Sequence, residues 1–91
     1  MKILIPTPLR QYAAGQSAVD VPASTVGEAV QALLTSHPEL RKHLYNDQGN
    51  LRAFVNLYLN EDDVRYLQRE QTPVGESDTL SIVPSIAGGR G

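Results

Sequence analysis

Three groups of residues in this sequence are of types that could do chemistry. A glycine pair, Gly88 and Gly89, stands near the end of the 91 residues. Two histidines, His37 and His43, could serve as bases or as metal ligands, and the three consecutive acidic residues at positions 61–63 could bind Ca²⁺. Each group also has an ordinary structural interpretation, and the surrounding chain decides between the two.

The histidines and the acidic run favour structural roles. His37 and His43 lie at and beyond the end of a predicted helix, where a cationic side chain meets the negative pole of the helix dipole, and the sequence offers no third metal ligand near them. The acidic run lacks the loop spacing and the glycine of an EF-hand. It is typical of a solvated hairpin tip that could also attract a basic partner surface, so we predict no metal site. The run consists of Glu61, Asp62 and Asp63.

The glycine pair is harder to dismiss. Glycine has no Cβ to restrict its backbone, so a pair near a chain end should stay mobile unless something ties it down. The simplest interpretation is a frayed and solvated end. A functional interpretation depends on what the preceding residues build.

Length and composition exclude several classes of function. Ninety-one residues make one domain that is too small for a core and a deep active-site cleft together. The net charge of -2 predicts no nucleic-acid footprint and no polybasic membrane patch, and the absence of cysteine removes disulfides and thiolate chemistry. No apolar run reaches the length of a signal segment or a membrane span, so we expect a cytoplasmic location.

The first half of the chain predicts two strands and one helix. Alternation in residues 2–6 and 17–21 indicates strands that pair antiparallel. Thr25 is a plausible N-cap and Glu28 completes a capping box, while Pro38 should end the helix. The apolar stripe of this helix consists of Val26, Ala29, Val30, Leu33 and Leu34.

The second half predicts three more strands. Residues 53–59 alternate, residues 60–62 form a hairpin turn, and residues 64–66 return as a short strand. Residues 67–74 should be irregular, and residues 79–83 form the last strand. The order β-β-α-β-β-β predicts an α+β domain in which one helix covers one face of a sheet.

This order resembles the ubiquitin-like β-grasp fold. Residues 81–89, Ser-Ile-Val-Pro-Ser-Ile-Ala-Gly-Gly, resemble the terminus of the ThiS/MoaD family of sulfur-carrier proteins, and residues 5–10 and 54–66 resemble its CysO-like, cysteine-biosynthesis branch. The resemblance implies a mixed sheet of four to five strands, with the first and last strands parallel neighbours at its centre. It also implies a β-grasp domain at residues 1–84 and a flexible tail at residues 85–91.

The resemblance further implies a protein cosubstrate and not an enzyme. A ubiquitin-activating-like enzyme would use ATP to adenylate the carboxylate of Gly89, next to Gly88, and sulfur would then form a thiocarboxylate. The sulfur would pass to an acceptor such as a pyridoxal-phosphate-dependent cysteine synthase, and the carrier would hold no cofactor. A ubiquitin-like tag or interaction module, and a small non-catalytic subunit of a molybdopterin-synthase-like enzyme, remain alternatives.

One feature departs from the family pattern, in which the reactive glycine is usually last. Here Arg90 and Gly91 follow Gly89, whose carboxyl group is therefore held in an amide. Our hypothesis is a precursor that a JAMM-type zinc metallopeptidase cleaves between Gly89 and Arg90. Alternatively Gly91 itself reacts, or the last two residues are a cloning remnant.

Apolar residues that the helix does not cover are the candidates for docking a partner. The alternation places Leu4, Phe54 and Tyr58 on the open face of the sheet, beside the tail. Ordinary surface apolarity, or a second small core under residues 67–74, would explain them equally well. The full set of predicted partner-binding residues is Leu4, Leu9, Phe54, Tyr58, Ile86 and Ala87.

Overall fold

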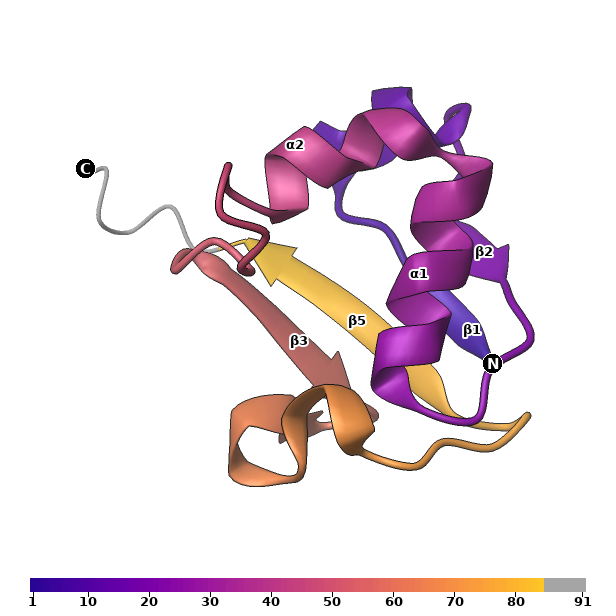
Figure 1. The fold of residues 1–91 in the computed structure, drawn as a ribbon. Helices are drawn as coiled ribbons and strands as arrows, with labels where there is room; N and C mark the ends of the chain where they lie inside the picture. The colour runs from indigo at the N-terminus through magenta and orange to yellow at the C-terminus, as the bar shows by residue number, and fades with distance from the viewer. Residues whose placement is uncertain (85–91) are drawn as a thin grey trace.

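The computed structural model describes residues 1–84, which form one mixed sheet with helices on one side (Figure 1). The five strands lie in the order β2-β1-β5-β3-β4. β1 is parallel to β5, and the other neighbouring strands are antiparallel. The predicted α+β class, the paired first strands and the parallel central pair are confirmed. The strands are β1 Lys2–Leu4, β2 Ala18–Asp20, β3 Val55–Leu59, β4 Asp62–Asp63 and β5 Thr79–Pro84.

The main helix begins and ends where its capping residues predict. The Thr25 side-chain oxygen accepts a hydrogen bond from the Glu28 N–H at 3.2 Å, and the Glu28 carboxylate accepts one from the Ser24 N–H at 2.8 Å. These bonds satisfy donors that a helix start leaves unpaired. Pro38 opens a separate 3-10 turn. The helices are η1 Thr7–Ala13, α1 Val26–Ser36, η2 Pro38–Leu40, α2 Arg41–Leu44, η3 Val64–Tyr66 and η4 Arg69–Gln71.

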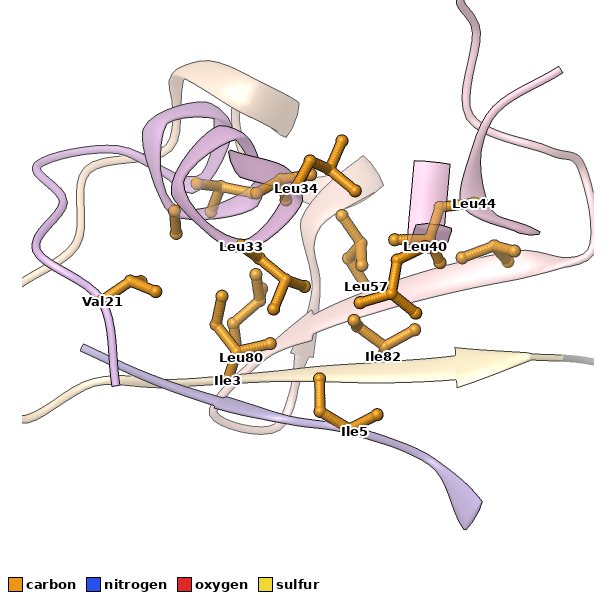
Figure 2. Close-up of a cluster of buried hydrophobic side chains, with 14 of the residues drawn as sticks. Ile3, Ile5, Val21, Leu33, Leu34, Leu40, Leu44, Leu57, Leu80 and Ile82 are labelled. Carbon is orange, nitrogen blue, oxygen red and sulfur yellow. The ribbon is translucent and has the colours of Figure 1, made fainter. Parts of the chain in front are cut away.

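The core lies between the helices and the inward face of the sheet (Figure 2). Ile3 on β1, Leu33 on α1 and Leu80 on β5 have no exposed surface, because the α1 stripe packs on the central strand pair. Leu40 and Leu44, four residues apart, are buried and extend this layer toward the far end of β5. Within residues 1–84, no helix is both long enough and apolar enough to cross a bilayer.

The predicted strand at residues 64–66 is wrong. These residues form the 3-10 helix η3, and the strand that pairs with β3 is the shorter β4 just before it. The cause is Asp63, whose Oδ1 accepts a hydrogen bond from the Arg65 N–H at 2.9 Å. A side-chain bond to the backbone two residues ahead favours a turn over continued extension.

Two further helical segments were not predicted. The prolines at positions 6 and 8 end β1, but Pro8 also occupies the first turn of η1, whose Leu9 and Ala13 are buried four residues apart. Within residues 67–74, η4 packs against α1 so closely that a Cβ on Gly27 would lie 3.1 Å from the Glu70 carbonyl oxygen. Both segments therefore contribute to the helical layer.

Candidate functional site

β5 ends near the middle of the sheet, between β1 and β3 (Figure 1). Its last residue, Pro84, pairs with Val55 at the start of β3, and the parallel strand β1 ends on the same side at Leu4. The predicted tail therefore begins at the end of a central strand of the sheet. The predicted reactive, cleavage and tail-docking residues lie outside the described part of the chain: Ile86, Ala87, Gly88, Gly89 and Arg90.

The face of the sheet away from the helices carries a row of predicted docking residues. Leu4 is aligned with Ser81, which is aligned in turn with Tyr58, so the row crosses β1, β5 and β3. Leu4 is 39% exposed and Tyr58 is half-buried, as the alternation predicts. Val83 is also apolar and 42% exposed, but the predicted docking residues did not include it. The inward Leu80 and Ile82 already implied that Val83 points outward.

Residues 67–74 do not cover this face. They include η4, which packs on α1 and therefore lies on the helical side of the sheet. A second small core between this loop and the open face, one of the two structural explanations of the exposed residues, is wrong.

A groove of about 500 Å³ opens where β5 ends. We call it the tail-exit groove. Phe54, 48% exposed, lines it immediately before β3. Leu9 also lines it but is only 9% exposed and belongs to the core, so the expectation of an exposed Leu9 beside the tail is wrong: η1 turns its side chain inward. The lining residues are Pro8, Leu9, Lys42, His43, Arg52, Phe54, Val55 and Pro84.

The two histidines occupy structural positions. His37 caps α1, and its backbone N–H donates to the Leu33 carbonyl at 2.8 Å. The His43 ring stacks on Tyr12 with a centroid distance of 4.1 Å, and its Nε2 is buried with no hydrogen-bond partner among residues 1–84. No cluster of three metal-binding side chains occurs in this part of the chain.

The acidic run is only partly the solvated tip that was expected. Glu61 and Asp62 are exposed, but the Asp63 side chain is 7% exposed and its Oδ2 lies 2.7 Å from Nη2 of Arg65. Hydrogen bonds from the Arg65 side chain and then its backbone hold the pKa of the Asp63 carboxyl below its usual value. Asp63 therefore stabilises the turn into η3.

Two other depressions lie on the helical side. One has a volume of about 340 Å³ and includes Tyr45. The pKa of the Tyr45 hydroxyl is raised, mainly by burial and then by the charge of Glu70. The other, of about 580 Å³, lies beside α2 and mixes carboxylates with cations. Among the described residues, neither is lined by a serine, cysteine or histidine. Neither therefore pairs a serine or cysteine nucleophile with a histidine base.

The strand order, the covering helix and the exit of the chain between β1 and β3 define a ubiquitin-like β-grasp protein. A chain in the crystal structure of the Amycolatopsis orientalis BexX/CysO complex superposes with a TM-score of 0.86 at 33% identity, covering 97% of this chain and 98% of that one. The ThiS family model matches residues 3–89, and the chain belongs to the ThiS family.

Individual relatives are consistent with the CysO-like branch of this family. The "Sulfur carrier protein CysO" of Mycobacterium tuberculosis is 33% identical over 89 residues, covering 96% of each chain. The "Small archaeal modifier protein 1" of Haloferax volcanii is 35% identical over 66 residues, covering 72% of this chain and 71% of its own. The similarity therefore supports a sulfur-carrier role and includes a ubiquitin-like modifier.

Proposed function

We propose that this chain is a sulfur carrier, a protein cosubstrate that partner enzymes activate and discharge. The observation that carries the proposal is the extent of the family match, which runs from residue 3 through Gly89 and so includes the glycine pair. The chain supplies a carboxyl group and a docking surface, and the nucleotide chemistry belongs to the partner.

The chemistry begins with an unreactive anion. An α-carboxylate has a pKa of about 3.3–3.7, so at neutral pH it is charged and a poor electrophile. The partner would join a carboxylate oxygen of Gly89 to the α-phosphorus of ATP and release pyrophosphate. A sulfur nucleophile then attacks the carbonyl carbon, AMP departs, and a thiocarboxylate remains on Gly89. No cofactor needs to be held by the carrier in these steps.

The tail would deliver this group away from the folded body. Residues 85–89 can span about 17 Å when extended at about 3.3 Å per residue. Glycine at the end leaves the carboxyl carbon open to attack inside a narrow site. A division into a body at residues 1–84 and a reactive tail at residues 85–91 suits this delivery.

We further propose that Arg90 and Gly91 are removed first. The family match stops at Gly89, which favours Gly89 over Gly91 as the reactive residue. A JAMM-type zinc metallopeptidase would hydrolyse the amide between Gly89 and Arg90 and expose the carboxylate. The intact mass of protein recovered from its native cells tests this step, and a pool that still ends at Gly91 under sulfur demand would contradict it.

Similarity to CysO proteins favours cysteine as the product, with a pyridoxal-phosphate-dependent enzyme as the acceptor. A protein tag is the second candidate, because the Haloferax volcanii relative is named a modifier protein. In that case the activated Gly89 would be joined to lysine side chains of other proteins.

One experiment separates these functions. The chain ending at Gly89 is incubated with ATP, sulfide and its cognate adenylating enzyme, with the 91-residue chain as the matched control. A mass gain equal to replacement of one oxygen by sulfur, seen only in the shortened chain, supports the carrier and the trimming. Isopeptide-linked conjugates would support the tag, and a stable complex with a large subunit would support the molybdopterin-synthase-like alternative. Conversion of the 91-residue chain alone would make Gly91 the reactive residue, and conversion of both chains would show that trimming is not required.

A further inference from the structure

The tail-exit groove has a chemical character of its own. Its walls come from η1, α2, the approach to β3 and the end of β5, which are far apart in the sequence. The floor is apolar, with Leu9 and Val55 buried and Pro8 and Phe54 at its edge. A surface of this kind favours an apolar side chain of a partner over water.

The charged side chains in its wall are cationic. They are Lys42 and Arg52, and no aspartate or glutamate of the described residues lines the groove, although the whole sequence has ten acidic residues and eight basic ones. Arg52 Nε donates to the Lys42 carbonyl oxygen at 3.0 Å, which fixes its position. Within residues 1–84 neither side chain forms an ion pair. Both also line the neighbouring depression beside α2, which includes Glu39 and Asp47.

His43 adds an incomplete polar group to the same wall. Its Nε2 has no hydrogen-bond partner among residues 1–84, and a buried polar atom without a partner costs free energy. A polar group brought into the groove by another molecule, with a small adjustment of the ring, would remove that cost.

We propose that the tail-exit groove docks an acidic segment with an apolar anchor residue, supplied by the protein that receives the tail. The groove contains Pro84, the residue that precedes the predicted tail, so a protein that receives the tail would lie close to the groove. The anchor packs on the floor beside Phe54, and carboxylates approach Lys42 and Arg52. This inference rests on the proposed function for the identity of the partner and on the groove's composition for its chemistry.

Charge reversal at Lys42 provides the test. Charges at the rim of an interface act mainly on the rate of association and on its salt dependence. Lys42→Glu in the 91-residue chain and in the chain ending at Gly89 should therefore slow association with the cognate adenylating enzyme about tenfold at low salt, and its rate should depend less on salt.

Arg69→Glu is the matched control. It makes the same change of charge on η4, on the helical side and outside the groove, and should leave the association rate within about twofold of the original protein. Thermal unfolding of each variant shows that it is folded. Unchanged association of a folded Lys42→Glu variant would overturn the inference, and so would equal effects of the two variants.

A second measurement is independent of the enzyme. A synthetic peptide with two central leucines flanked by glutamates is titrated into the isotope-labelled 91-residue chain, and a lysine-flanked peptide serves as the control. We expect saturable amide shifts gathered at residues 42, 43, 52 and 54, absent with the lysine-flanked peptide and weakened several-fold by Lys42→Glu and by added salt. Scattered shifts, or equal shifts with both peptides, would overturn the inference.

The two measurements separate this inference from the proposed function. If a thiocarboxylate forms and Lys42→Glu associates with the enzyme at an unchanged rate, the carrier function is supported and the docking role of the groove is refuted. If a partner or the acidic peptide binds at the groove but no thiocarboxylate forms, the docking role of the groove is supported and the carrier function is refuted. If no enzyme binds, the peptide titration alone decides.

Discussion

Truncation of Phe54 should weaken partner binding while leaving the domain folded. Phe54 lies just before β3, opposite the end of β5. Two predicted docking residues line the tail-exit groove, Leu9 and Phe54, and of these Phe54 is the exposed one. The residue is 48% exposed, so about half of it is available to a partner while the other half already packs on the domain.

The expected loss follows from this exposure. A phenylalanine side chain presents about 200 Å², of which 48% leaves roughly 95 Å² to be covered on binding. At about 25 cal/mol per Å², this area contributes about 2.4 kcal/mol to binding, and one factor of ten in Kd corresponds to about 1.4 kcal/mol. Phe54→Ala should therefore raise the Kd for the adenylating enzyme by up to about 50-fold.

Calorimetric titration of the chain ending at Gly89 with the enzyme measures this Kd. Tyr66→Ala is the control, because Tyr66 is an aromatic residue that is 83% exposed on η3, at the opposite end of β3 from the tail exit (Figure 1). If exposed aromatic area alone governed binding, Tyr66→Ala would cost more than Phe54→Ala. A folded Phe54→Ala variant that binds within twofold of the original protein would refute the assignment.

Three further predictions concern the fold itself. Leu33→Ala removes a side chain with no exposed surface and should lower the free energy of unfolding by about 2–5 kcal/mol, measured by urea denaturation. Thr25→Ala leaves the Glu28 N–H without its acceptor and should cost about 1 kcal/mol in the same assay; no change would show that the cap is dispensable. The lowered pKa of the Asp63 carboxyl predicts that its charged form stabilises the fold above the unfolded pKa of about 3.9, and that this stabilisation is lost as the pH falls through the lower folded value. In denaturation measured on both sides of this range, Asp63→Asn should therefore be less stable than the original protein only on the neutral side.

The sequence predicted those elements in which local and periodic signals agree. In α1, the cap at Thr25, the stripe that includes Leu33 and the stop at Pro38 all indicate one helix. The alternation of β5 and of β3 likewise predicted which side chains point inward. The parallel pairing of β1 with β5 is different, because no local pattern specifies which strands meet, and only the resemblance to the β-grasp fold implied it.

The errors occur where one side chain outweighs a short pattern. Three residues at positions 64–66 are too few to distinguish a strand from a turn, and the bond from Asp63 to the Arg65 N–H decides for the turn. At η1 the prolines indicate only where β1 ends, and the buried turn that follows is marked by Leu9 and Ala13 at helical spacing. The tail-exit groove depends on η1 and α2 meeting at the end of β5, a tertiary arrangement that no local pattern in the sequence specifies.

The core and the edge where the tail begins should have separate roles in this small domain, and variants at the two places should distinguish them. Leu33 packs against the central strands and Phe54 stands at the edge where the tail begins. Leu33→Ala should lower stability yet leave the Kd for the enzyme nearly unchanged at temperatures where the variant is folded, because it leaves the open face intact. Phe54→Ala should instead lose affinity, with a loss of stability no larger than that of Leu33→Ala, because Phe54 is only half buried and Leu33 has no exposed surface. If Leu33→Ala and Phe54→Ala instead lost stability and affinity in the same proportion, the docking surface could not be separated from the core. The open face and the groove would then have no function distinct from that of the core.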